Sequence, residues 1–309
     1  MTFVIQKLRA LFRVLYYRNP LNLYIGQKVF GNDSGLLANT VGNTALKLDQ
    51  LRSKASIKIT NQFSTEVKHF RKHGWVKLED IEFGETLDIL KDKFDMYCEN
   101  SIAPDSQRLE VTSITNNNEL FQRFPEIKSV LTNKLQDFIT EFYEAHFTVL
   151  NVHIYRIFSV PEQLKKSSKY RPYGATGCWH NDGSTVDTVK LFVLIDDVNE
   201  ENGPLRIINS QDTSKSIRKN YYRYIHDGIP GKGIDQNNNV VKFTGKRGSV
   251  LLANPNTCLH RASEPKPGKH RDMLVFYLTS AASPLPQDWH SKATHHQTLG
   301  FSRLLAKYN

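Results

Sequence analysis

The stretch from Gly177 to Gly183 places the strongest constraint on the fold. It ends an apolar and aromatic run in the triplet His180-Asn181-Asp182, and Gly183 then allows the backbone to turn at once. Residues two apart in an extended strand point the same way, so His180 and Asp182 can present two metal-ligating groups on one side of a strand end. A third ligand must come from elsewhere in the chain.

His260 is the best candidate for this third ligand, eighty residues downstream of His180. Two neutral imidazoles and one carboxylate form the facial triad of non-haem Fe(II) oxygenases, which leaves coordination positions open for a co-substrate and O2. Arg271 follows eleven residues after His260, at the head of the apolar run Met273–Leu278. A bare His-x-Asp usually marks a surface turn with a capping Asp, so the surrounding sequence must distinguish a metal site from such a turn.

The surrounding pattern is ordered along the chain. A strand-like segment, Thr188–Val198, follows the triplet, and the turn Asn-Glu-Glu-Asn-Gly-Pro begins at Asn199. This order of His-x-Asp, strand, Glu-Asn-Gly turn, distal His and Arg resembles the phytanoyl-CoA dioxygenase family of Fe(II)/2-oxoglutarate oxygenases. The resemblance covers residues 60 to 283 and is densest from Trp179 to Leu278.

The resemblance implies a role for each matching residue. His180, Asp182 and His260 correspond to the iron ligands, and Arg271 corresponds to the anchor for the distal carboxylate of 2-oxoglutarate. The implied cofactors are therefore Fe(II), with 2-oxoglutarate and O2 as co-substrates. Iron and 2-oxoglutarate together would hydroxylate a substrate and release succinate and CO2. Halogenases need a halide where Asp182 stands, which favours hydroxylation.

The chain departs from the family pattern at two places. It reads Asn209-Ser210-Gln211-Asp212 where the family usually has Pro-Gly-Ser-His. It also has Ala262 where a Ser two positions after the distal His often helps to hold 2-oxoglutarate, with Ser263 one place later. We name Ser263 as the candidate second contact, and Tyr155 as a further contact from a neighbouring strand.

The expected fold is mainly β with flanking helices, because the strand-rich centre shows alternating patterns and regular turn punctuation. In the family this is a double-stranded β-helix, a cupin-like jelly roll. The expected strands and helices are as follows: helices at 63–73, 86–98 and 124–145, and strands at 74–78, 149–160, 188–198, 240–243 and 249–253. Residues 264–269 are expected to form a tight turn between two antiparallel strands, which places Arg271 near the metal.

Three alternatives remain open from the sequence. A cupin-type metal oxygenase without 2-oxoglutarate would share the ligands but have no use for Arg271. A non-catalytic binding protein on the same scaffold would tolerate loss of His180 or His260. A nucleic-acid-binding protein would use the basic and aromatic residues in the long insertion 212–247, although an active-site wall or lid is the better interpretation of that loop.

Composition limits the class of protein and its partners. The 309 residues include 39% hydrophobic and 23% charged residues, which is ordinary for a globular protein. No apolar run is long enough to span a membrane, and three scattered cysteines favour a reducing, cytoplasmic compartment. The net charge of +10 attracts anions. The substrate is left open among anionic, lipid-linked and sugar-linked small molecules, as is the oligomeric state.

The chain divides into an N-terminal part, residues 1–59, and an oxygenase domain, residues 60–309. Residues 1–18 predict a basic amphipathic helix, which can lie on a membrane as a peripheral contact or dock on the core. Residues 30–58 are rich in Gly, Asn, Ser and Thr, and we interpret them as a linker. The basic loop 161–177, directly before the His-x-Asp triplet, has the character of an active-site lid.

Overall fold

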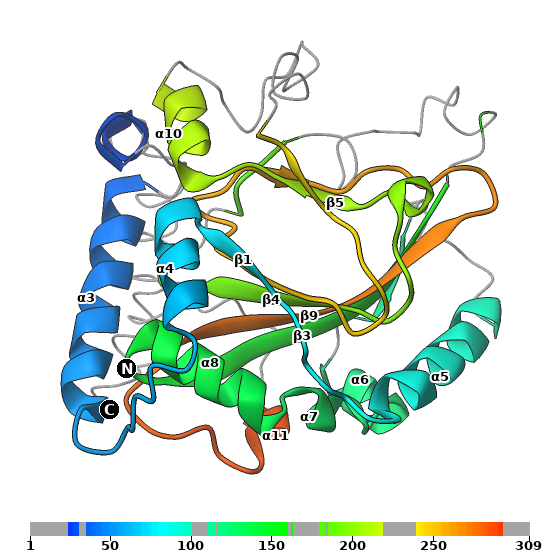
Figure 1. Cartoon of the computed structure of the whole chain (residues 1–309), viewed down its shortest axis with the longest axis horizontal. Coiled ribbons are helices and arrows are strands. Elements are labelled where there is room, and N and C mark those ends of the chain that lie inside the picture. The colour runs from blue at the N-terminus through cyan, green and yellow to red at the C-terminus, as the bar shows by residue number, and fades with distance from the viewer. Residues whose placement is uncertain are drawn as a thin grey trace, which may run out of the picture.

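The computed structural model describes residues 24–30, 35–100, 111–114, 117–159, 162, 179–182, 185–218 and 239–292. Within these ranges the core is a large antiparallel sheet that faces a smaller one, with helices on the outer side of the large sheet (Figure 1). This arrangement confirms the predicted jelly roll with flanking helices. None of the described helices is long and apolar enough to cross a membrane.

The large sheet has six strands in the order β1-β7-β4-β9-β3-β2, and the small sheet has the order β6-β5-β8. The bounds of the large-sheet strands are β1 (Trp75–Leu78), β7 (Val250–Ala253), β4 (Val189–Leu194), β9 (His270–Ala281), β3 (His146–Phe158) and β2 (Val111–Ile114). Those of the small sheet are β6 (Val241–Phe243), β5 (Leu205–Ile207) and β8 (His260–Arg261).

Alternation along each strand divides the apolar residues of the large sheet between two cores. On β4, Leu191 and Val193 join the outer core beneath the helices, whereas Phe192 and Leu194 join the inner core between the sheets. On β9, Met273 and Val275 face the same inner core. Arg271 and Lys190 occupy inner-face positions by the same alternation, so two charged side chains project into the space between the sheets.

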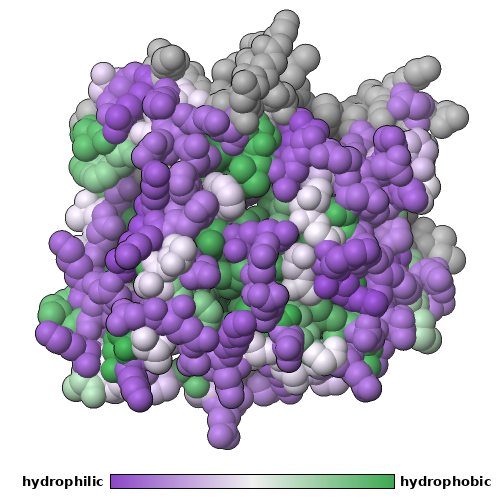
Figure 2. Space-filling model, in the orientation of Figure 1, coloured by the Kyte–Doolittle hydropathy of each residue, from purple (hydrophilic) through white to green (hydrophobic). Residues whose placement is uncertain are grey.

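Helices cover the outer face of the large sheet. They are α4 (Ser64–His73), α5 (Thr86–Asn100), α6 (Asn117–Arg123), α7 (Ile127–Val130), α8 (Asn133–Tyr143) and α11 (Trp289–Lys292). Helix α3 (Gly35–Ser53) stands along the ends of the strands (Figure 1). The short π-helix η1 (Gly26–Phe30), the 3-10 turn η2 (Glu200–Asn202) and α10 (Ser210–Arg218) complete the described elements. The surface over α4 and α8 is largely hydrophilic, with apolar groups showing between polar side chains (Figure 2).

The interpretation of residues 30–58 as a linker is wrong, because α3 fills most of that range and packs on the core. Ser53 Oγ donates to the Ala281 carbonyl at 3.1 Å, and Ser280 Oγ donates to buried Asp49 at 2.8 Å. Helix α3 contacts the core through small residues: a Cβ added to Gly42 would lie only 3.0 Å from the Val186 nitrogen. Because small residues make this contact, the sequence of α3 lacks the helical repeat of large apolar residues that would have predicted a helix. The division at residue 59 and the helix predicted at 1–18 stay predictions, since residues 1–23 lie outside the described ranges.

Two other sequence predictions need correction. The single helix expected at 124–145 is two helices, because Leu131 (ψ 68°) and Thr132 (ψ 160°) leave the helical region and Thr132 caps α8 through the Leu135 N–H. The turn at 264–269 does not join paired strands. It carries the chain from β8 in the small sheet to β9 in the large sheet, although it still brings Arg271 to the inner face.

A buried ionic network ties α5 to the outer face of β9 and β3. Arg156 donates from Nε and Nη2 to both oxygens of fully buried Asp272, at 2.7 and 2.5 Å, and also contacts Asp95. Lys91 bridges Asp95, Asp196 and Asp272. The network therefore neutralises carboxylates that would otherwise be costly to bury.

We expect Asp272→Asn to lower the free energy of unfolding by about 3 kcal/mol, because it leaves the buried Arg156 guanidinium without its bidentate partner. The matched control is Asp197→Asn, which removes the exposed pair with Lys246 and should cost less than about 1 kcal/mol. Urea unfolding of both variants checks the prediction. Equal effects of the two substitutions would show that the buried network does not carry this stability.

Candidate functional site

The structure brings His180, Asp182 and His260 together at one mouth of the space between the sheets. His180 and His260 pair in antiparallel fashion, each donating its backbone N–H to the other's carbonyl at 3.0 Å. The Asp182 N–H donates to the Pro255 carbonyl at 3.0 Å. These bonds clamp the His-x-Asp segment onto the chain that leads into β8, and so they join residues eighty positions apart.

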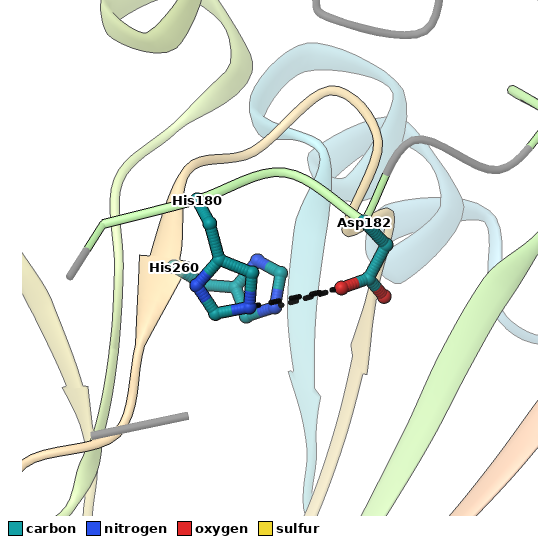
Figure 3. A group of neighbouring side chains, drawn as sticks. All are labelled: His180, Asp182 and His260. Carbon is teal, nitrogen blue, oxygen red and sulfur yellow. Dashed lines mark ion pairs between the residues drawn. The ribbon is translucent and has the colours of Figure 1, made fainter. Parts of the chain in front are cut away.

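The three side chains converge on a common point. Asp182 Oδ1 lies 3.8 Å from His180 Nε2 and 3.5 Å from His260 Nε2 (Figure 3). The two rings are neighbours, with centroids 4.4 Å apart, and one ligand atom from each residue lies within 4.8 Å of the others. Two imidazole nitrogens and one carboxylate oxygen so arranged fit a divalent first-row metal such as iron.

The tautomer of His260 suits it to metal binding. Its Nδ1 lies 3.2 Å from the Cys258 carbonyl, which can only accept a hydrogen bond. The hydrogen is therefore assigned to Nδ1, and the lone pair is on Nε2, the nitrogen that faces Asp182. Cys258 itself donates its thiol to the His73 carbonyl, and burial raises its pKa to about 12, so it stays a neutral thiol.

Lys190 in β4 completes the immediate surroundings of Asp182. Its Nζ lies 2.5 Å from Asp182 Oδ2. Burial alone would raise the pKa of the Asp182 carboxyl, but the charge of Lys190 outweighs burial and holds this pKa well below its ordinary range. Burial alone would lower the pKa of Lys190, yet Asp182 keeps it above its ordinary value. Both groups are thus charged at neutral pH.

Buried amides fix the loop that carries Asp182. Asn181 is fully buried, and its Nδ2 donates to the Asn256 carbonyl at 2.9 Å. Asn256 in turn donates to the carbonyls of Thr185 and Thr188, at 3.0 and 3.1 Å. Sequence analysis missed both amides and Lys190. For Lys190 a signal existed, since it is the one charged residue in the apolar strand Val189–Leu194.

Arg271 is a fully buried cation without a counter-charge in contact. None of its three guanidinium nitrogens has a hydrogen-bond partner of regular geometry among the described residues. Burial lowers the pKa of this guanidinium, and the attraction of Tyr155 and Asp272 offsets only part of that effect. Five donors in a buried fork call for a carboxylate, so the site has the right group to hold the far end of a dicarboxylate.

The other two predicted cofactor contacts lie differently. Tyr155 is beside Ala262 in a small apolar cluster with Ile157, the residue directly opposite Arg271 on β3. Its hydroxyl donates to Met273 Sδ at 3.2 Å. Ser263 Oγ is buried with no hydrogen-bond partner among the described residues. The roles of Tyr155 and Ser263 stay predictions.

Other groups with metal-like spacing are already occupied. Asp95, His270 and Asp272 also lie close enough to share an ion, but Arg156 and Lys91 fill the space between these carboxylates. His153 contacts Asn151 Nδ2 at 2.7 Å and the Tyr277 hydroxyl at 3.3 Å, so its ring nitrogens are engaged within β3 and β9. Apart from residue 162, the predicted lid 161–177 lies outside the described ranges, as do residues 219–238 of the insertion.

A separate hollow of about 730 Å³ lies on the outer surface among α3, α4 and α8. None of His180, Asp182, His260 and Arg271 lines it. Its buried carboxylate, Glu141, accepts the Phe63 N–H at 3.1 Å and so has a structural partner. The hollow is therefore distinct from the candidate site.

Comparisons with known proteins agree with this geometry. The sequence profile described as phytanoyl-CoA dioxygenase (PhyH) matches residues 70–273, which is more than half of the chain. No curated protein sequence matches.

Among solved structures, similarity of fold is clear at low identity. EctD from S. alaskensis, solved with 2-oxoglutarate and 5-hydroxyectoine, is 17% identical, with a TM-score of 0.50 over 70% of this chain and 76% of that one. AviO1 from Streptomyces viridochromogenes Tue57 is 16% identical, with a TM-score of 0.51 over 74% and 99%. SnoK, a non-haem alpha-ketoglutarate-dependent carbocyclase from nogalamycin biosynthesis, is 16% identical, with a TM-score of 0.51 over 77% and 93%.

The buried Asp182–Lys190 pair gives a test of the site's electrostatics. In buffer with a metal chelator, Asp182→Asn should lower the free energy of unfolding by about 3 kcal/mol near pH 7, because it leaves Lys190 buried and unpaired. The folded-state pKa of Asp182 is lowered, so its stabilising contribution is complete above the unfolded value of about 3.9 and is lost as pH falls below it. The difference between wild type and variant should therefore shrink below about pH 4.

Urea unfolding at several pH values checks this prediction. Asp88→Asn, which removes an exposed pair with Arg247, serves as the control and should change stability by less than about 1 kcal/mol. A difference for Asp182→Asn that stays constant down to the acid transition would contradict the assigned charge state.

Proposed function

The chain belongs to the phytanoyl-CoA dioxygenase family of Fe(II)- and 2-oxoglutarate-dependent oxygenases, and from this premise we propose that it hydroxylates a small molecule at the His180, Asp182 and His260 site. Family membership removes the cupin-type alternative without 2-oxoglutarate and the non-catalytic alternative. The observation that carries the proposal is the convergence of both Nε2 atoms on one oxygen of Asp182.

In this proposal His180, Asp182 and His260 are the three protein ligands of the iron. The backbone clamp between the two histidines and the buried Asn181 and Asn256 hold these groups in place without metal. Such preorganisation keeps the ligands from having to be ordered when the ion binds. A carboxylate ligand also distinguishes a hydroxylation site from one that must admit a halide.

Arg271 is proposed to bind the distal carboxylate of 2-oxoglutarate. Its fully buried guanidinium, which has no hydrogen-bond partner among the described residues, supports this role. A buried cation is costly unless a ligand supplies a negative charge. A bidentate, charge-assisted pair would orient the long axis of the co-substrate along the inner face of β9. Ser263 and Tyr155 are proposed as its further contacts.

Bound iron and 2-oxoglutarate together supply the oxidation: one atom of O2 enters the substrate as a hydroxyl, the other enters succinate, and CO2 leaves. The side chains of the protein bind and orient the iron and the co-substrate and shield them from water. Lys190 and Arg271 balance the negative charges of Asp182 and the co-substrate, and the apolar inner core beside Met273 and Val275 excludes water.

The proposed substrate is a small anionic molecule. The net charge of +10 supports this class, since a strongly positive protein raises the local concentration of anions. Nothing in the described residues selects between a lipid-linked and a sugar-linked anion.

Removing a ligand tests the assignment of the metal site. We expect Asp182→Ala to abolish 2-oxoglutarate-dependent O2 consumption, because the site loses its only carboxylate ligand. The matched control is Asp197→Ala, at an exposed position in the turn after β4, which should retain wild-type turnover. Full turnover by Asp182→Ala would rule out the ligand assignment.

Anaerobic titration with Fe(II) and then 2-oxoglutarate tests the co-substrate anchor. Wild type should develop the visible charge-transfer band of the chelate. We expect Arg271→Gln to need at least about tenfold more 2-oxoglutarate, since a charge-assisted hydrogen-bond pair of about 1.5–3 kcal/mol is lost.

The control for this titration is Arg247→Gln, an exposed arginine paired with Asp88, which should behave as wild type. An unchanged 2-oxoglutarate requirement in Arg271→Gln would refute the proposed anchor. Absence of bound iron in wild type would refute the proposed site as a whole.

A further inference from the structure

Lys190 occupies an unusual position for a lysine. It is the second residue of β4, opposite Ala253 on one side and Tyr277 on the other, and it is only 9% exposed. Lysine is almost never buried to this degree without a partner. The neighbouring inner-face residues of the strand, Phe192 and Leu194, are apolar core residues, so packing alone would favour an apolar side chain here.

The contacts of Lys190 hold its ammonium group in one place. Nζ lies 2.5 Å from Asp182 Oδ2 and 4.7 Å from the centroid of the Tyr277 ring. The cation–π contact and the ion pair together fix the group from two directions. Because Lys190 is in the centre of the large sheet, its backbone cannot move without disturbing β7 and β9.

As a result, the two oxygens of Asp182 have different surroundings. Oδ1 faces both imidazole Nε2 atoms, at 3.8 and 3.5 Å, whereas Oδ2 is engaged by Lys190. A free carboxylate can bind a cation through one oxygen or through both. In this site, Oδ1 is the Asp182 oxygen that remains available to a metal ion.

We propose that Lys190 is a positioning residue that holds Asp182 Oδ2 away from the metal, so that the carboxylate occupies a single coordination position. This inference rests on the proposed ligand role of Asp182. Two histidines and one carboxylate oxygen leave three positions of an octahedral ion for the two atoms of the 2-oxoglutarate chelate and for O2. A carboxylate that bound through both oxygens would take one of these positions and compete with the co-substrate.

Two substitutions separate the hydrogen bond of Lys190 from its charge. Lys190→Met keeps the length and apolar stem but has no donor. Lys190→Gln loses the charge but keeps an N–H donor, carried one bond closer to the backbone than Nζ. The matched control is Lys246→Met, which removes an exposed lysine from its pair with Asp197 at 2.7 Å.

The experiment is an anaerobic titration of the full chain, with Fe(II) first and 2-oxoglutarate second, followed by calorimetry and the charge-transfer band. Lys190→Met should still bind one equivalent of Fe(II), because all three ligands remain and a nearby positive charge has been removed. Its affinity for 2-oxoglutarate should fall at least about tenfold, which is equivalent to about 1.4 kcal/mol. Its charge-transfer band should be weaker than that of wild type. Lys190→Gln should lose less than about threefold, and Lys246→Met should match wild type.

Two results would overturn the proposal. One is wild-type 2-oxoglutarate affinity and band in Lys190→Met. The other is equal loss in Lys190→Met and Lys190→Gln, which would show that the charge matters rather than the hold on Oδ2.

If Lys190→Met does not fold, Tyr277→Leu provides the second test. It removes the ring beneath the ammonium and should weaken 2-oxoglutarate binding by a few fold, and unchanged binding would again overturn the proposal. Failure of wild type to bind Fe(II) or to show the band would instead refute the proposed function, so the two failures are distinguishable.

Discussion

The paired backbones of His180 and His260 are the interaction on which the rest of the site depends. Two hydrogen bonds at 3.0 Å join the segment that carries the His-x-Asp triplet to the start of β8. Without them, the side chains of His180 and Asp182 would form an isolated turn, which is the common fate of a His-x-Asp triplet. With them, Asp182 is directed at both imidazoles, and the position of Lys190 on the adjacent strand becomes significant.

The sequence was sufficient for the fold class and for the grouping of His180, Asp182 and His260, because each rests on strong local signals. The apolar alternation of β4 and β9 is clear, and His180, Asp182, His260 and Arg271 match a family pattern residue by residue. The structure brings the first three together and buries Arg271 on an inner face. Their chemical roles are part of the proposed function and await the titrations.

Other features depend on contacts that no local pattern records. Helix α3 packs through Gly42 and other small residues, so its sequence has the composition of a linker. The break before α8 depends on one threonine cap. Lys190 stands in an apolar strand where a lysine has no local explanation, and its partner Asp182 precedes it by eight residues across a turn. The crossing from β8 to β9 could be mistaken for a hairpin because both have the same turn residues.

Consecutive residues of β9 face opposite electrostatic environments. Arg271 projects into the interior and contacts no counter-charge in the described part of the chain, whereas Asp272 is held by Arg156 in the outer network. A slip of this strand by a single residue would exchange the two faces. Depending on its direction, the slip would put either Asp272 at the position of Arg271, where the co-substrate's own carboxylate is proposed to lie, or Arg271 opposite Arg156. Insertions and deletions within β9 should therefore be among the least tolerated changes in the chain, so that evolutionary variation in length is confined to the loops at the ends of the strands.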